Sequence, residues 1–189
     1  MPESISSERP SDFPTTCAIA LKEWAAVVLG LLEGRHSILL RKGGIHEGGF
    51  HLEHERFFLF PTYEHQKPDF IRPEHHDLIG HSASWGASAG RLILPAYSEV
   101  VSVQEARTLA ALRGLSEFHI WSDLYLEMRL AYKPEKPLHV ILLRVFRLPD
   151  PPIIRVTEAH GGCVSWVPLE DECSVYKPTP VLPRPNMVQ

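Results

Sequence analysis

Polar side chains follow one another without a spacer at the end of an apolar run. The segment FLFPTYEHQ leaves an aromatic stretch at Pro61 and continues into a hydroxyl, a phenol, a carboxylate, an imidazole and an amide. Glu64 and His65 are types that serve as general acid or base, and Tyr63 can stack on a base. A packed core cannot hold such groups unpaired, so we expect them at the rim of a polar cleft. The predicted rim is Thr62, Tyr63, Glu64, His65 and Gln66.

An alternative interpretation of the same segment is structural. Thr62 could cap a helix start in which the neighbouring polar groups satisfy one another. Both interpretations stay open at the level of residue types.

A basic, glycine-rich stretch, LLRKGGIHEGG, is the second candidate for binding. Arg41 and Lys42 could hold an anion, while Gly43 and Gly44 let the backbone approach a ligand closely. We expect this stretch to lead into the cleft. The alternative is a strand that ends in a glycine turn with a basic edge. The G-x-x-x-x-G-K-[ST] spacing of a P-loop is missing, which excludes a nucleotide site of that kind.

Residues 128–147 form a markedly basic stretch, with five basic groups against one acidic group, Glu135. Arg144 interrupts an apolar strand pattern there, and we expect it to contact phosphate. Charged strand edges that discourage aggregation are the alternative. Trp121, a few residues upstream, supplies a ring that could stack on a base or belong to the core.

Six of the eleven histidines fall between residues 45 and 77, which raises the question of a metal site. His51 and His54 would point to opposite faces of a strand, and neither HExxH nor a paired cysteine and histidine pattern occurs. We therefore expect solvated histidines at His51, His54, His65, His75 and His76, beside an acidic loop, with no metal and no cofactor.

Length and composition are those of one folded domain. With 189 residues, 44% hydrophobic and 22% charged, the chain can build a core. We place the domain at 16–176, between flexible tails at 1–15 and 177–189. A net charge of −4 argues against a protein that coats nucleic acid non-specifically, but it allows a local basic groove.

The cysteine spacing and the length of the apolar runs predict where in the cell the protein is found. Three cysteines without paired spacing favour reduced thiols, so we expect a cytoplasmic protein. The N-terminus shows no signal-peptide pattern. The longest apolar run, AAVVLGLL, is far shorter than the roughly 20 residues that span a bilayer, so we expect no membrane partner.

Apolar periodicity predicts the elements that position these side chains. A helix over 24–31 carries an apolar stripe at i, i+3, i+4 and i+7 and stops at Gly34. An S-x-x-E capping box predicts a second helix over 103–113. A long loop over 67–98 holds one short helix near 73–79. Strands are predicted at 36–42, 50–60, 124–132, 137–148 and 163–169.

These strands are not regularly separated by helices. The order therefore predicts an α+β fold, with a mixed, mostly antiparallel sheet or a small β-barrel and flanking helices.

Five stretches together carry a family resemblance: ALKEWAAVVLGLLEGRHSILLRKGGI, FFLFPTYEHQ, FHIW, YKPEKPLHVILLRVFRLPDPP and GCVSWVPL. They resemble the bacterial family catalogued as domain of unknown function 1802, over most of residues 20–169. The resemblance implies no known activity. Some relatives are thought to occur near restriction-type nucleases, which implies a link to DNA and to defence systems.

The stretches LKEWAAVVLGLLEGRHSILLRK and HVILLRVFRLPDPP are also similar to parts of PUA, EVE and ASCH domains. That resemblance implies a small twisted PUA-like barrel with flanking helices, which binds RNA or modified bases in a cleft. A few ASCH members hydrolyse modified nucleosides. The loop over 67–98 has no counterpart in those domains.

Three functions stay open on this basis. One is recognition of nucleic acid, a modified base or a nucleotide, with Arg41, Lys42 and Arg144 on phosphate and Tyr63, His65 and Trp121 around a base. Another is a small hydrolase or nuclease, in which Glu64 or His65 is the general base and Lys42 stabilises developing negative charge. The last is a subunit that binds partner proteins.

Overall fold

The computed structural model describes residues 14–42, 52–85, 90–162 and 164–181. Its strands are β1 (Thr16–Trp24), β2 (Ile38–Arg41), β3 (Arg56–Thr62), β4 (Arg91–Ile93), β5 (Ala96–Ala106), β6 (Leu138–Arg147), β7 (Ile153–Arg155), β8 (Trp166–Ser174) and β9 (Thr179–Pro180). Its α-helices are α1 (Ala25–Leu32), α2 (Asp77–His81), α3 (Leu109–Arg113) and α4 (Asp123–Ala131). Short 3-10 helices lie at Pro68–Phe70, Pro73–His75, Ser82–Trp85, Ser116–Phe118 and Glu158–His160.

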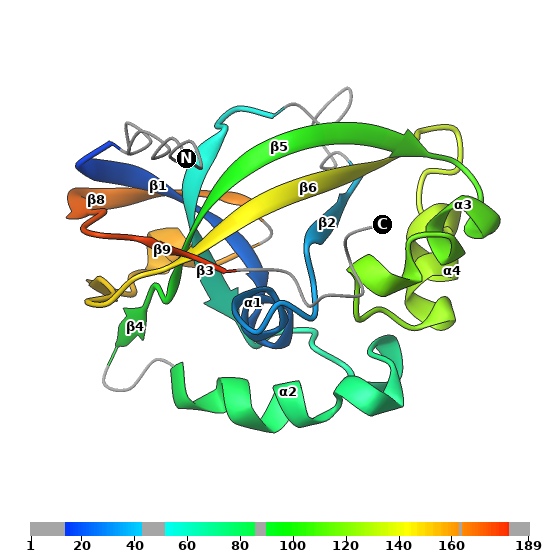
Figure 1. Cartoon of the computed structure of the whole chain (residues 1–189), viewed down its shortest axis with the longest axis horizontal. Coiled ribbons are helices and arrows are strands. Elements are labelled where there is room, and N and C mark those ends of the chain that lie inside the picture. The colour runs from blue at the N-terminus through cyan, green and yellow to red at the C-terminus, as the bar shows by residue number, and fades with distance from the viewer. Residues whose placement is uncertain (1–13, 43–51, 86–89, 163, 182–189) are drawn as a thin grey trace, which may run out of the picture.

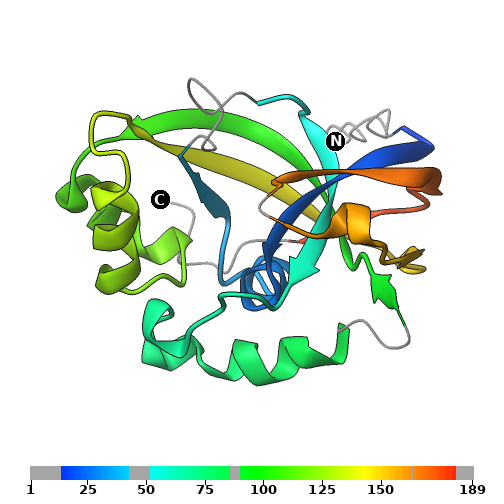
Figure 2. The same cartoon turned by 180° about the vertical axis from the view of Figure 1, so that it is seen from behind.

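One mixed sheet forms the frame of the molecule. Its strands run in the order β2-β6-β5-β3-β1-β8, and β9 adds to β6. β1 and β3 are parallel, whereas the other neighbours are antiparallel. Seen from behind, β1 and β8 lie together at one side and β2 lies toward the other (Figure 2).

The predicted α+β fold with a mixed, mostly antiparallel sheet is confirmed. The sheet does not close into a barrel, because its end strands β2 and β8 do not pair within the described residues. A separate two-stranded sheet joins β4 to β7.

Helix α1 follows β1 without a loop and fills the space under the sheet. Figure 1 shows it end-on beneath the arch of β5 and β6, with α2 below it. It is apolar around its circumference, as expected of a helix that is packed on nearly every side. The predicted stop is confirmed: Gly34 has a φ of 67°, in the left-handed region that glycine adopts without a Cβ penalty. Among the described residues, no helix is long and apolar enough to cross a bilayer.

The helix predicted over 103–113 is wrong in its first half. β5 continues through Ala106 and stays paired with β6 over this whole length. The ladder hydrogen bonds and the strand preference of the valines outweigh the capping signal at Ser102. The helix begins only after Thr108, whose side chain accepts from the Ala111 N–H at 3.2 Å.

The strand predicted over 124–132 is also wrong, because this segment is helix α4. Its apolar residues alternate, but Ser122 Oγ accepts from the Tyr125 N–H at 3.4 Å and so caps a helix start. Tyr125 and Leu126 are the buried side chains of this helix. α3 and α4 lie together at one end of β5 and β6 (Figure 1).

β3 passes through the proline that was expected to end the strand predicted over 50–60. Pro61 pairs with Glu23 of parallel β1, and the strand ends at Thr62. On its other side β3 pairs with β5 only up to Phe58. Pro61 has no N–H to donate, but β3 has no hydrogen-bonded partner on this side after Phe58. The proline therefore removes no hydrogen bond between β3 and β5 and is tolerated there.

The predicted long loop over 67–98 holds α2, three short 3-10 helices, β4 and the start of β5. The one short helix expected near 73–79 lies slightly later, at Asp77–His81. Arg35 donates to both carboxylate oxygens of Asp77, at 2.8 and 2.7 Å, and this links α2 to the end of α1.

Sheet contacts continue past residue 176, where the flexible tail was placed. β9 pairs with β6, and the Val181 N–H donates to the Val145 carbonyl at 2.9 Å.

Two buried histidines hold the segment before α4 against the core. His36 Nδ1 accepts from the Ile120 N–H at 3.1 Å, and His119 Nδ1 accepts from the Trp121 N–H at 3.2 Å. His119 Nε2 lies 3.3 Å from the Leu112 carbonyl, to which it donates. Burial lowers the pKa of His119 to about 4, so both rings of this pair stay neutral near pH 7.

This burial predicts a loss of stability in mild acid. The unfolded chain takes up a proton at His119 near pH 6.5, whereas the folded chain does so only near pH 4. Between these values the unfolded state binds more protons, so the free energy of unfolding falls as pH falls, by about 2 kcal/mol at pH 5. Urea unfolding at about pH 7.5 and pH 5 measures this, and His119→Gln should make the dependence smaller by about that amount, while buried His36, whose pKa is also lowered, keeps part of it. A free energy of unfolding that is equal at both pH values would contradict the assignment.

Candidate nucleotide-binding cleft

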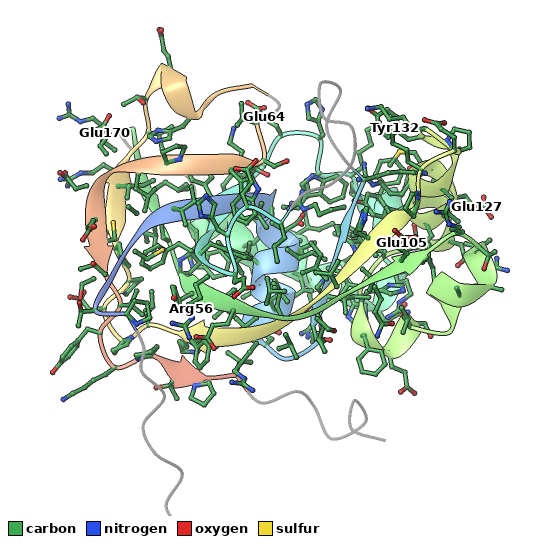
Figure 3. The ribbon with its side chains drawn as sticks, turned by 90° about the horizontal axis from the view of Figure 1, so that it is seen from above. Arg56, Glu64, Glu105, Glu127, Tyr132 and Glu170 are labelled. Atoms are coloured by element: carbon green, nitrogen blue, oxygen red, sulfur yellow. The ribbon has the colours of Figure 1, made fainter. Side chains whose placement is uncertain are left out.

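A cleft of about 370 Å³ opens where β1, β2 and β3 end. Because β1 and β3 are parallel, their carboxyl ends meet at the same edge of the sheet. Figure 3 labels Glu64 just beyond this end of β3, with Arg56 at the strand's other end. The lining residues are Lys22, Glu23, Trp24, Leu40, Arg41, Thr62, Glu64, His65, Tyr125, Met128, Arg129, Gly162, Val164 and Ser165.

A buried ion pair holds the three strand ends together. Arg41 Nη2 donates to Glu23 Oε2 at 2.9 Å and to the Lys22 carbonyl at 2.6 Å. Glu23 is only 7% exposed, and its other oxygen accepts from the Trp24 N–H at 2.8 Å. Thr62 Oγ1 donates to the Glu23 carbonyl at 3.2 Å. Arg41 Nε is buried and has no hydrogen-bond partner in the described part of the chain.

Helix α4 contributes a second guanidinium and an aromatic wall. Arg129 Nε is also buried without a partner among the residues that the structure describes. The Tyr125 ring stacks on Trp121 with centroids 4.1 Å apart and lies 5.5 Å from the Trp24 ring. Burial raises the pKa of Tyr125 to about 12, so its phenol stays neutral. The cleft therefore combines aromatic rings with two arginine side chains.

Three of the predicted rim residues, Thr62, Glu64 and His65, line the cleft. Glu64 and His65 are exposed, and His65 has a φ of 62°, a left-handed conformation that is uncommon outside glycine. Tyr63 donates from its hydroxyl to the Ser82 carbonyl at 2.9 Å. It lines an adjoining cavity of about 340 Å³ that shares Thr62 and Glu64 with the cleft.

Two of the predicted binding residues serve helix ends instead. Gln66 Oε1 accepts from the Ala26 N–H at 3.0 Å, in the first turn of α1. Lys42 is 5% exposed, and its ammonium donates to the Arg129 and Leu130 carbonyls at 3.2 and 2.9 Å, near the end of α4. Both side chains satisfy backbone groups that a helix terminus leaves unpaired.

The remaining predicted residues do not join the cleft. Trp121 is 2% exposed and lies in the core, so its ring has no room to stack on a base. Arg144 lines a different cavity and lies 3.9 Å from Glu99. Gly43 and Gly44 lie outside the described residues.

Three histidines of the cluster, His54, His75 and His76, contact other protein groups. The His54 ring packs edge-on against Trp166 at 5.1 Å, and His76 Nε2 lies 2.9 Å from the Ile71 carbonyl. Within the described ranges, no three His, Cys, Asp or Glu side chains gather in a way that could hold a metal ion. His51 lies outside these ranges.

Among the cleft residues that sequence reasoning missed are Trp24, Tyr125 and Arg129. Trp24 was placed on a helical stripe, and the other two were placed on a strand. Ser122 followed by Asp123 is the helix-start signal that identifies α4. With a helix there, Tyr125 and Arg129 are four residues apart and share one face.

The role of Gln66 predicts a stability effect. Gln66→Leu leaves the Ala26 N–H without its acceptor and should lower the free energy of unfolding by about 1–2 kcal/mol. Gln66→Glu is the matched control, since it keeps an acceptor and places a negative charge near a helix N-terminus. Urea unfolding compares the variants. An unchanged midpoint in Gln66→Leu would show that this bond does not support the start of α1.

Comparison with known proteins found a family and a set of similar structures. Three crystal structures of an ASCH protein from Zymomonas mobilis are similar to this chain. The unsubstituted protein is 11% identical with a TM-score of 0.42, and the match covers 80% of this chain and 87% of that chain. A tyrosine-to-phenylalanine variant of it is 11% identical with a TM-score of 0.44, and the match covers 80% of this chain and 89% of that chain. A serine-to-alanine variant is 12% identical with a TM-score of 0.41, and the match covers 87% of this chain and 92% of that chain.

No curated protein matches this chain at a significant level. A family model described as Domain of unknown function (DUF1802) matches residues 20–188. Because this match spans most of its length, the chain belongs to the DUF1802 family.

Proposed function

We propose that the cleft recognises one nucleotide of a nucleic acid, a free nucleotide or a modified base. The observation that carries this proposal is the pair of arginines, Arg41 and Arg129, which line one cleft and have buried Nε atoms without partners among the described residues. A buried donor without an acceptor costs about 1–3 kcal/mol, which a phosphate or base oxygen would recover. Arginine forks suit such oxygens because they donate two parallel hydrogen bonds.

The rest of the lining fits a base with its phosphate. Trp24, which is half-buried, supplies an aromatic face backed by the Tyr125 ring, and stacking on such a face is worth about 1–3 kcal/mol per base. Three basic side chains against two acidic ones line the cleft, so it attracts an anion although the whole chain has a net charge of −4. Its volume of about 370 Å³ suits one extruded nucleotide better than a duplex. We assign this role to one cytoplasmic domain, with a link to defence systems as part of the proposal.

A second candidate function is hydrolysis of a nucleoside or nucleic acid in the same cleft. The exposed neighbours Glu64 and His65 both line it, and the backbone at His65 has the strained φ of 62° that tends to occur at functional sites. Either side chain could accept a proton from an attacking water. Lys42 has no part in this candidate, because two backbone carbonyls hold its ammonium.

The recognition proposal predicts that Arg129→Gln weakens binding of short single-stranded RNA or DNA about tenfold, since a charged hydrogen bond is worth about 1.5–3 kcal/mol. It should also lower the slope of log K against log salt concentration by about 0.7 for each lost phosphate contact. Fluorescence anisotropy with single- and double-stranded oligonucleotides, with and without modified bases, measures both quantities.

Arg107→Gln is the matched control for that experiment. Arg107 is 60% exposed and does not line the cleft, so this variant should bind like the natural chain. Equal affinities in the two variants would contradict the proposal, and so would the absence of binding by the natural chain.

The hydrolysis candidate predicts products and a specific loss. Glu64→Gln should lower turnover by about 100-fold or more, because general base catalysis contributes at least that much. The unfolding midpoint should not change, since Glu64 is exposed. Chromatography of the binding samples detects the products. Binding without products would reject this candidate, whereas products with full activity in Glu64→Gln would move the role to His65.

A further inference from the structure

A cavity of about 340 Å³ lies apart from the cleft, between the end of α1, β6 and the C-terminal segment. It shares no lining residue with the cleft. Apolar side chains, among them Leu31, Leu142 and Val181, form most of its wall. This volume falls in the range of about 300–1,000 Å³ that small-molecule sites occupy.

A histidine and a serine line the wall, and the hydroxyl of the serine is a buried donor without an acceptor among the described residues. His36 Nδ1 accepts from the Ile120 N–H, so the ring proton of the neutral side chain lies on Nε2. Ser37 Oγ is buried without a hydrogen-bond partner in the described part of the chain. His36 is 2% exposed and Ser37 9% exposed. A buried hydroxyl in a native protein nearly always has a partner, so Ser37 indicates an oxygen acceptor from a ligand.

Arg144 supplies a positive charge at the opening of this cavity. Its side chain lines the cavity and is 60% exposed. The carboxylate of Glu99 lies 3.9 Å from it but makes a shorter ion pair, 3.1 Å, with Arg56. One carboxylate therefore faces two guanidinium groups, and the opening favours an anion.

We infer that this cavity binds a small apolar carboxylic acid that carries a further carbonyl or hydroxyl oxygen. The carboxylate pairs with Arg144, the apolar body packs against the leucines and Val181, and the further oxygen accepts from the Ser37 hydroxyl. This inference is independent of the function proposed for the cleft.

Calorimetric titration of the full chain with benzoylpropionate tests the inference. We expect saturable binding with one site per chain. Phenylbutyrate, which lacks the ketone oxygen, and benzoylpropionamide, which lacks the charge, should each bind about tenfold more weakly, because each loses one polar contact.

Variants assign the contacts. Arg144→Gln should weaken benzoylpropionate about tenfold, whereas Arg107→Gln, at an equally exposed arginine, should not change its affinity. Ser37→Ala should bring benzoylpropionate down to the affinity of phenylbutyrate. Circular dichroism and the unfolding midpoint check that each variant is folded.

Three results of the titrations would overturn the inference. They are no saturable binding of benzoylpropionate, equal affinity for the acid and its amide, and equal affinity in the two arginine variants. A dimer in light scattering that blocks the acid would assign this face to a second copy of the chain, and it would overturn the inference as well.

Discussion

The ion pair between Glu23 and Arg41 joins the ends of three strands and the start of α1. Through its two oxygens and its carbonyl, Glu23 contacts Arg41 at the end of β2, the Trp24 backbone before α1 and Thr62 at the end of β3. A buried carboxylate is tolerated only when it is paired and hydrogen-bonded, and removing one partner of such a pair costs about 3–5 kcal/mol. The strand ends must therefore stay together, and the cleft opens where they meet.

Helix termini decide which polar residues near the cleft remain available to a ligand. Each terminus leaves backbone groups without partners, and a nearby side chain of the right type satisfies them. Gln66 does so for α1 and Lys42 for α4. The side chains of Arg129 and Glu64 do not cap a helix in the described structure. Both line the cleft, where they can contact a ligand.

Helix α1 connects the two cavities. Trp24, which precedes its first residue, lines the cleft, whereas Leu31 near its end lines the apolar cavity. The helix is almost wholly buried, so ligands in the two cavities would contact the same rigid element. The two linings differ in chemistry: one combines aromatic rings with arginines, and the other is apolar with a single arginine at its opening.

The sequence by itself determined the elements with strong local signals. The all-apolar helix before Gly34 and the strand over 137–148 followed from periodicity, and the mixed sheet followed from the order of the elements. Thr62, Glu64, His65 and Arg41 were predicted beside a cleft and line it.

Only the tertiary structure decided the extents of β5 and α4 and the full lining of the cleft. Pairing with β6 extended β5 past its local capping signal, and the buried aromatic cluster gave Tyr125 a partner in Trp121. The physical reason is that local patterns report the preferences of neighbouring residues. Which distant strand ends meet depends on the sheet order, and that order buries Trp121 and separates Arg144 from the cleft.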